Sequence, residues 1–286
     1  MEINSISELD GSGQKYDLLL RWFGVINDKV IVALSGGVDS AVVALAAQMR
    51  LGQRAMAITA NCATTSEEEL KSAVNVAKEI GIKHEIVEYN VLVNQNFTRN
   101  DNARCYHCRK DLAFHLVSKG KEIGAKSIVD GTHVDDLGDH RPGIIALREA
   151  GVRHPLLEVG LNKSDIRKIA EYFRLSVSNK PANSCLASRI PQGKDITHSL
   201  ISRIEKAESI VKTIFGVEQV RVRDHDELAR IEVGKAELDR LFDVKKLEEA
   251  DKMIKELGFR YVSVDMRGYR QGSLVMDSSE GDLANR

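Results

Sequence analysis

The sequence contains little of several features that would mark a specialised protein. Only 4 of its 286 residues are cysteine, too few for a disulfide-held scaffold. Aromatic residues make up 5% of the chain, which argues against an extended surface for stacking nucleic-acid bases. The formal net charge is −1, so no excess of one sign indicates nucleic acid or a membrane as the main partner. No apolar run approaches the roughly 18 residues of a membrane span, and the acidic, polar start is not a secretory signal. We therefore expect a cytoplasmic protein.

The composition itself, with 43% apolar and 29% charged residues, is typical of a globular protein. Short β-branched runs alternate with helical patterns over the first two-thirds of the chain, which predicts a doubly wound parallel sheet covered on both faces, an α/β fold. The expected strands cover residues 29–34, 54–59, 83–88 and 127–129, and the expected helices 40–49, 66–80, 110–123 and 162–173. Ligands bind such sheets beyond the carboxyl ends of the strands, where the strand order reverses.

The pattern changes in the last third of the chain. All four prolines fall between Pro142 and Pro191, which indicates several irregular connections in that stretch. Beyond it we expect helices over 200–215 and 244–257 and strands over 219–223, 229–233 and 260–266. The sequence thus predicts two domains, residues 1–195 and a smaller α+β domain over 196–286 that ends in a frayed tail.

The strongest local signal is a glycine-rich loop between the first strand and the first predicted helix of the sheet. It comprises Ser35, Gly36, Gly37, Val38, Asp39 and Ser40. Glycines let the backbone approach an anion, the amides at a helix start point toward it, and Asp39 can bind magnesium held by phosphates. No P-loop lysine follows, so this is not a Walker loop. The alternative is a glycine-rich turn that binds nothing.

The hexapeptide SGGVDS after a buried strand resembles the pyrophosphatase loop of the PP-loop ATPases. The resemblance implies an enzyme that splits ATP into AMP and pyrophosphate while adenylating a substrate. That superfamily includes NAD synthetases, GMP synthetases and tRNA-thiolating enzymes, so the loop alone implies the nucleotide but not the substrate.

The four cysteines fall into different settings. Cys185 lies in a non-periodic segment between Lys180 and Arg189, and nearby cations favour the nucleophilic thiolate; the alternative is a small apolar residue in a loop. Cys105 and Cys108 form a C-x-x-C pair, which could be redox-active, half of a zinc site, or part of an iron–sulfur site. Cys62, just after the second strand, is expected to be a packing residue.

Further motifs narrow the resemblance to the LarE family, the ATP-dependent sulfur transferases of nickel-pincer nucleotide biosynthesis. They occur in order over roughly residues 10–275: SGGVDS, RCYHCRK, DGTHVDD, GDHRPG, CLASRIPQG, VRVR, RIE and GYRQGS. The chain departs from the family at Gln192, where tyrosine is expected, and at His133, where asparagine is common.

The LarE resemblance implies a reaction in two stages. ATP with Mg²⁺ would bind on the loop, its adenine near Thr59 and near Gly131 and Thr132, and Asp39 would act in catalysis. A carboxylate of pyridinium-3,5-dicarboxylate mononucleotide would be adenylated and then converted to a thiocarboxylate. In members with a lone cysteine, the thiol corresponding to Cys185 gives up its sulfur and leaves dehydroalanine. In members with the C-x-x-C pair, Cys105, Cys108 and Cys185 would hold a [4Fe–4S] cluster whose open iron delivers sulfide, the version that we prefer here.

The same resemblance suggests contacts with the nucleotide substrate. Arg221 and Arg223 alternate along a strand, so they share a face and could grip a phosphate, whereas the alternative is a solvated strand edge. Glu232 could pair with them or bind metal. The remaining residues assigned to substrate binding are Lys110 and Arg189. The family also implies a homo-oligomer and a downstream nickel-insertion protein as partner.

Three other functions share part of this sequence pattern. An amide ligase like NAD or GMP synthetase would use the same ATP chemistry but needs no cysteine. A tRNA-thiolating enzyme is weakened by the near-zero net charge, since tRNA binding depends on neutralising phosphates. A metal- or cluster-binding module with a vestigial nucleotide fold would bind no ATP.

Overall fold

The computed structural model describes residues 10–138, 142–182 and 184–270. These form two compact units. The first consists of the described residues of Met1–Asn94 and Ala103–Asn183, and the second of those of Gln95–Asn102 and Ser184–Arg286. The division falls before the boundary predicted at residue 195, and an eight-residue piece from the middle of the chain joins the second unit. No helix among the described residues is long and apolar enough to cross a membrane.

The first unit is built on a four-stranded parallel sheet in the order β3-β2-β1-β4. Its strands are β1 Val30–Ala33, β2 Ala55–Asn61, β3 Lys83–Glu88 and β4 Ser127–Val129. Its α-helices are α1 Asp10–Ile26, α2 Val38–Leu51, α3 Glu67–Ile80, α5 Arg104–Ile123, α6 Pro142–Glu149, α7 Pro155–Glu158 and α8 Lys163–Tyr172. The doubly wound α/β fold is therefore confirmed, and the strand order reverses between β1 and β4, where a ligand is expected.

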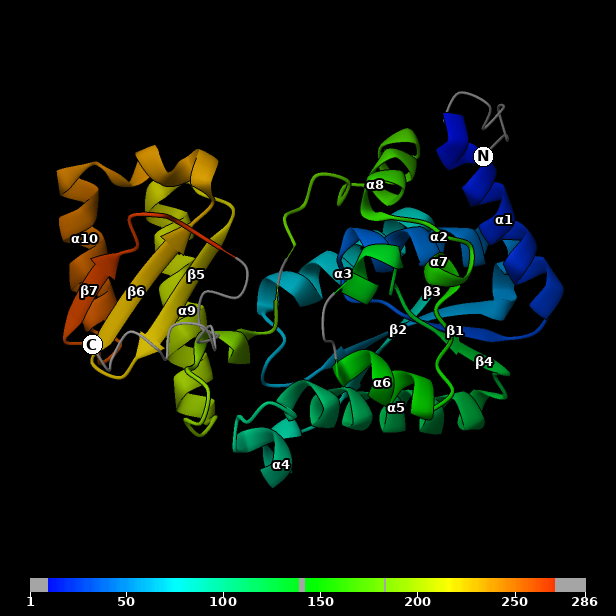
Figure 1. The fold of residues 1–286 in the computed structure, drawn as a ribbon, viewed down its shortest axis with the longest axis horizontal. Coiled ribbons are helices and arrows are strands. Elements are labelled where there is room, and N and C mark those ends of the chain that lie inside the picture. The colour runs from blue at the N-terminus through cyan, green and yellow to red at the C-terminus, as the bar shows by residue number, and fades with distance from the viewer. Residues whose placement is uncertain (1–9, 139–141, 183, 271–286) are drawn as a thin grey trace, which may run out of the picture. The chain divides into compact units, whose positions relative to one another are not determined.

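Side chains of β1 point alternately to the two faces of this sheet. Val30 and Val32 pack with α1, α2, α3 and α8, while Ile31 packs with α5 and α6, and Figure 1 shows the two helical layers on opposite faces. A capping box opens α3, with Glu69 N bonded to Ser66 Oγ at 3.2 Å. Helix α1 was not predicted, although it buries Tyr16, Leu19 and Phe23 completely.

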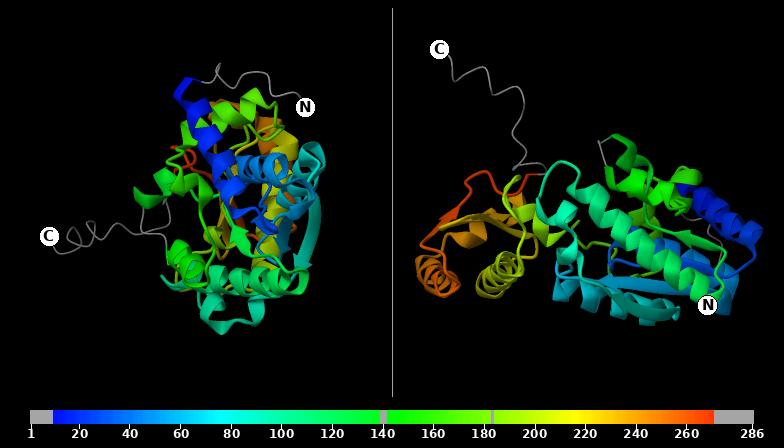
Figure 2. Two further views of the ribbon diagram at one scale, coloured as in Figure 1. Left: turned by 90° about the vertical axis from the view of Figure 1, so that its right-hand side faces the viewer. Right: turned by 90° about the horizontal axis from the view of Figure 1, so that it is seen from below.

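The second unit contains a three-stranded mixed sheet in the order β5-β6-β7. Its strands are β5 Val220–His225, β6 Leu228–Val233 and β7 Tyr261–Val264, and its α-helices are α4 Gln95–Thr98, α9 His198–Phe215 and α10 Val244–Lys255. Figure 2 shows α9 and α10 on one face of the sheet, where Val220, Val222 and Ile231 form a core with them. The predicted α+β architecture of this part is confirmed.

The piece around Asn100 belongs to the second unit because it is hydrogen-bonded there. The Asn100 side-chain amide donates to the carbonyl oxygens of Pro191 and Lys194 at 2.8 and 3.0 Å. Gly193 N in turn donates to Asn100 O at 3.0 Å. These bonds join Gln95–Asn102 to residues 191–194, and both pieces belong to the second unit, whereas the boundary predicted at residue 195 placed them in the first.

Candidate active site

The phosphate loop follows β1 and leads into α2, as predicted. Gly37 is the N-cap of α2 in an extended conformation, with φ −98° and ψ 163°. Ser40 Oγ donates to Gly37 O at 3.1 Å and accepts a bond of 3.1 Å from Ser35 N. The Ser40 hydroxyl therefore ties together the two ends of the loop, at the start of a helix whose amides favour an anion.

Gly36 packs against helix α3 so closely that no side chain fits. Its φ is +75°, and a Cβ built there would lie 2.7 Å from both Ala73 N and Glu69 O. Its carbonyl oxygen accepts hydrogen bonds from Ser72 Oγ at 2.9 Å and from Lys180 Nζ at 3.0 Å. The loop conformation thus depends on glycine here and on two donors from distant parts of the chain.

Replacing Gly36 by alanine is expected to displace the loop and weaken nucleotide binding about tenfold. The alanine Cβ would collide with α3, and a non-glycine residue in the left-handed conformation costs a further ~1–2 kcal/mol. Gly81→Ala is the matched control, because Gly81 has φ +74° but nothing within 4 Å of a built Cβ. Titration with a non-hydrolysable ATP analogue checks the prediction. Equal affinity in the two variants would contradict it.

Asp39, in the first turn of α2, forms an ion pair that sequence reasoning missed. Lys163 Nζ lies 2.6 Å from Asp39 Oδ1 and 2.7 Å from Asp39 Oδ2. His133 Nε2 lies 3.8 Å from Asp39 Oδ1. Gly131 covers the same turn, since a Cβ there would be 2.7 Å from Ser40 N. No local motif marks Lys163, which reaches the loop only because α8 packs on α2.

The side-chain hydroxyls of Thr59 and Thr132, the threonines predicted to lie near adenine, form hydrogen bonds within the protein. Thr59 Oγ1 donates to Leu34 O at 2.8 Å and lies 2.8 Å from His84 Nε2, with the residue 3% exposed. Thr132 Oγ1 donates to Asp130 Oδ2 at 2.9 Å. Both hydroxyls therefore stabilise the chain at the carboxyl ends of β2 and β4.

A magnesium ion fits Asp39 only together with bound phosphates. Among the described residues, no group of three or more His, Cys, Asp or Glu side chains is arranged to hold a metal ion. Magnesium usually keeps several waters and binds through one or two carboxylates plus substrate phosphates, so one carboxylate beside an anion loop suits it. Two neighbouring carboxylates accept main-chain hydrogen bonds: Asp135 Oδ2 from Lys163 N at 2.7 Å and Asp136 Oδ2 from His133 N at 3.0 Å.

The C-x-x-C pair lies in the first turn of α5, not before a helix as the sequence suggested. Cys105 is exposed and Cys108 is half-buried. Residues three apart lie on one helix face, so both thiols could bind one ligand. Arg104 Nη2 lies 3.9 Å from Cys105 Sγ. Burial, with the Cys108 and Cys62 thiols nearby, raises the pKa of Tyr89 well above its usual range.

The other two cysteines differ in exposure. Cys185 is exposed and precedes the short 3₁₀ helix Leu186–Arg189 of the second unit. Cys62, predicted to be a packing residue, is half-buried, with its Sγ 3.3 Å from Thr64 Oγ1. The three predicted cluster ligands are divided between the units, since Cys105 and Cys108 belong to the first and Cys185 to the second.

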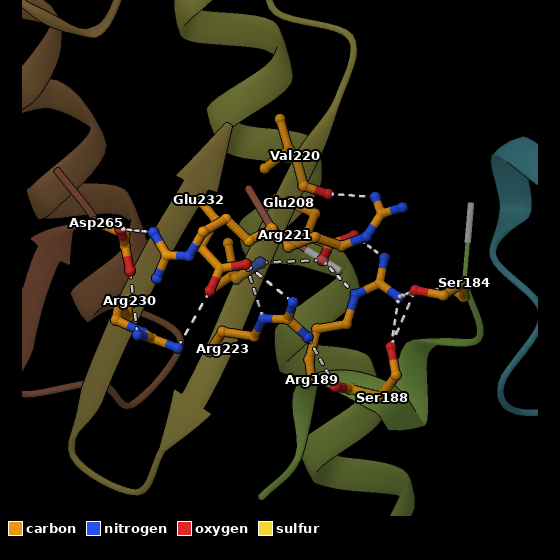
Figure 3. A network of polar contacts seen from close by, with 12 residues as sticks. Ser184, Ser188, Arg189, Glu208, Val220, Arg221, Arg223, Arg230, Glu232 and Asp265 are labelled. Carbon is orange, nitrogen blue, oxygen red and sulfur yellow. Dashed lines mark hydrogen bonds and ion pairs between the residues drawn. The ribbon is translucent and has the colours of Figure 1, made fainter. Parts of the chain in front are cut away.

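Arg189 does not face a substrate, and this corrects the sequence prediction. It is 0% exposed, and its Nε and Nη2 bond to Glu208 Oε1 and Oε2 at 2.7 and 3.0 Å. Its Nη1 donates to the carbonyl oxygen of Cys185 at 2.9 Å and also to that of Ser184, which Figure 3 labels beside it. The guanidinium therefore fixes the main chain that carries the exposed thiol.

The arginines of β5 share one sheet face, as predicted, but this face is buried rather than solvated. Arg223 is 5% exposed, bonds to Glu232 Oε2 at 3.0 Å and donates to Ser188 O at 2.8 Å (Figure 3). Arg221 is 3% exposed, and its guanidinium carbon lies 5.1 Å from the Tyr269 ring centroid. Burial lowers the pKa of Arg221 from its usual value.

Glu232 does pair with the arginines, one of its two predicted options. It is 0% exposed and lies 2.9 Å from Arg223 Nη2 and 3.1 Å from Arg230 Nη2. Arg230 continues the network to Asp265 at 3.1 Å (Figure 3). Lys110 belongs to the first unit, where it is exposed on α5 with its Nζ 5.9 Å from the Tyr106 ring centroid.

Replacing Arg189 by methionine is expected to lower the free energy of unfolding by about 3–5 kcal/mol, because it leaves the Glu208 carboxylate buried without its cation. Exposed Arg267, changed to methionine, is the control. Denaturant titration measures both. If the Arg189→Met variant had normal stability but a weaker affinity for substrate, Arg189 would instead bind substrate.

The chain is similar to known proteins over one family segment and over most of its length. Residues 24–112, which include the phosphate loop, match the family described as NAD synthase. An uncharacterized protein of Synechocystis is 40% identical over 91% of this chain and 96% of its own length. The pyridinium-3,5-bisthiocarboxylic acid mononucleotide synthase of Lactiplantibacillus plantarum is 32% identical over 90% of this chain and 92% of its own length. A tRNA-specific 2-thiouridylase of Rickettsia rickettsii is 24% identical over 74% of this chain and 67% of its own length.

The first two of these relatives span nearly the whole of both units. A glycine loop tied to a helix start, an adjacent carboxylate and a sheet that reverses its strand order beside them are the parts that ATP-splitting enzymes of this superfamily share. The chain therefore belongs to the NAD-synthase-like PP-loop ATP pyrophosphatases and, within them, to the family of the Lactiplantibacillus plantarum synthase.

Proposed function

We propose that this protein is an ATP-dependent sulfur transferase that converts a carboxylate of pyridinium-3,5-dicarboxylate mononucleotide into a thiocarboxylate. One observation carries the proposal: an exposed cysteine, whose main chain is held by a buried arginine, occurs in a chain that also contains a PP-loop and is 32% identical to the synthase named above. An amide ligase would require the loop but not the thiol.

In the first stage, the substrate carboxylate attacks the α-phosphorus of ATP. A new O–P bond forms, the bridging bond to the β-phosphate breaks, and pyrophosphate leaves. The amides of Gly37 and its neighbours would bind the departing phosphates, and Asp39 would hold Mg²⁺, which supplies charge neutralisation there. Adenylation is necessary because a carboxylate is a poor acyl donor, whereas AMP is a good leaving group.

In the second stage, sulfur attacks the acyl carbon, a C–S bond forms and AMP departs. If Cys185 supplies the sulfur, its thiolate forms a thioester. Loss of the Cα proton then breaks the Cβ–S bond, which leaves dehydroalanine at position 185 and a thiocarboxylate on the substrate. This route requires a thiol that a second molecule can reach, and Cys185 is exposed.

The C-x-x-C pair supports the second route of the proposal. Cys105 and Cys108 lie one helical turn apart and present two thiols, which fits two positions of a [4Fe–4S] cluster, and Cys185 would be the third ligand. Such a cluster, when bound, supplies sulfide at an iron without a protein ligand. Iron and sulfide analysis of anaerobically purified protein, followed by intact mass after turnover, separates the routes: loss of one sulfur from Cys185 excludes the cluster route.

The proposal extends to partners. A homo-oligomer would release its product to a nickel-inserting protein in the cytoplasm. A tRNA-thiolating activity is the second candidate, because of the thiouridylase that is 24% identical. The net charge of −1 disfavours it, because tRNA affinity depends on cationic contacts with phosphates.

Exchange of radiolabelled pyrophosphate into ATP tests the first stage. The proposal expects exchange only when the pyridinium dicarboxylate is present, since the reverse reaction needs the acyl-adenylate. Exchange that depends on tRNA, or on no carboxylate at all, would overturn the assignment.

A further inference from the structure

Lys163 forms an ion pair with the carboxylate that the proposed reaction needs for its metal ion. Its ammonium lies within 2.7 Å of both oxygens of Asp39, so it makes a bidentate contact. The two side chains are 30% and 27% exposed, which leaves both reachable from solvent. They are 124 positions apart in the sequence, so the contact is built by the fold rather than by local chain geometry.

The backbone of Lys163 is held in place independently of this ion pair. Lys163 is the first residue of α8, and its main-chain N donates to Asp135 Oδ2 at 2.7 Å. The preceding residue, Asn162, forms a capping box with Asp165. Only the flexible four-carbon side chain therefore has to move if the ammonium leaves Asp39.

Both oxygens of Asp39 accept hydrogen bonds from the Lys163 ammonium in this arrangement, so a divalent cation that approached them would meet a positive charge at short range. Mg²⁺ binds oxygen at about 2.0–2.1 Å, and an ammonium at hydrogen-bond distance from the same oxygens repels it. Removal of Lys163 from Asp39 becomes favourable once another anion is available to the ammonium. ATP bound on the adjacent loop offers such an anion in its phosphates.

We propose that Lys163 is a positioning residue that occupies Asp39 in the nucleotide-free protein and moves to the phosphates when metal-bound ATP arrives. This inference rests on the proposed function for the identity of the nucleotide. The lysine keeps the carboxylate from capturing metal without substrate and then helps to orient the polyphosphate. Lys180, the other lysine at the loop, does not share this role, because it donates to the main-chain oxygen of Gly36.

The test measures Mn²⁺ binding without nucleotide, by electron paramagnetic resonance of the free ion, and binding of α,β-methylene-ATP with Mg²⁺ by calorimetry. Lys163→Met is expected to bind Mn²⁺ alone about tenfold more tightly, because a cation next to the carboxylate has been removed. The same variant is expected to bind the analogue about tenfold more weakly, because one phosphate contact is lost. The two affinities should therefore change in opposite directions, whereas a purely structural role of Lys163 would weaken the binding of both Mn²⁺ and the analogue.

Three further variants make the result specific. Lys168→Met removes an exposed lysine from the same helix and should change neither affinity. Lys163→Arg should restore the cation and both wild-type affinities toward normal, and adding Asp39→Asn to Lys163→Met should remove the gain in Mn²⁺ affinity. The inference is overturned if Lys163→Met leaves Mn²⁺ binding unchanged or weakened. Failure of the wild-type protein to bind the analogue would overturn the proposed function, while the measurements with Mn²⁺ alone would still decide the role of Lys163.

Discussion

Cys185→Ala is expected to form no thiocarboxylate above background while it still exchanges pyrophosphate into ATP at close to the wild-type rate. The reason is that the two stages use different units of the chain: the phosphate loop belongs to the first unit and Cys185 to the second. Alanine removes only an exposed Sγ, and the carbonyl of residue 185 can still accept the hydrogen bond from Arg189. Product analysis and exchange are measured on the same preparation.

The matched control is Cys62→Ala, which removes a half-buried thiol near the end of β2. It should retain sulfur transfer. Loss of pyrophosphate exchange in Cys185→Ala would refute the separation of roles, and unchanged product formation would show that neither sulfur route passes through this residue.

Asp39→Asn is expected to have the reverse effect and stop the first stage. The amide keeps the shape of the side chain but loses the charge, and metal coordination to a reacting phosphate contributes several kcal/mol, so exchange should fall at least about a hundredfold. Folding should persist, because Asp39 is partly exposed and its ion-pair partner Lys163 can turn to solvent. Exchange kinetics over a range of Mg²⁺ concentrations check this.

Asp239→Asn, at an exposed position of the second unit, serves as the control for loss of a carboxylate. It should leave exchange unchanged. If Asp39→Asn retained full exchange and the same dependence on Mg²⁺, the loop would not position a metal through Asp39, and the lysine ion pair would need another explanation.

The fold of the first unit was largely predictable, because its signals are local. A strand that ends at Ser35-Gly36-Gly37, a capping box at Ser66 and a β-branched run at Lys83–Glu88 each depend on neighbouring residues. Helix α1 was missed although its apolar face is fully buried. The start of α5 was also misplaced, since Ala103 caps it without a side-chain bond and so leaves no sequence signature.

The site was predictable only where it is contiguous in the chain. The loop residues follow one another, so their pattern could be recognised, whereas Lys163 and Lys180 reach the loop through tertiary packing. Burial of the β5 arginines was also not predictable. The alternation of side chains along the strand placed Arg221 and Arg223 on one sheet face, but it could not show that Ser188 and Tyr269 contact them there. Parts of the GDHRPG and GYRQGS motifs, and the predicted frayed tail, lie outside the described residues.

The central claim is that ATP cleavage drives the replacement of oxygen by sulfur on a carboxylate. High-resolution mass spectrometry of the pyridinium dicarboxylate mononucleotide after incubation with the anaerobic protein and MgATP tests it most directly. We expect a product in which one carboxylate oxygen has been replaced by sulfur, with one AMP formed for each sulfur transferred. An amide product, or AMP and pyrophosphate formed with the carboxylate unchanged, would contradict it.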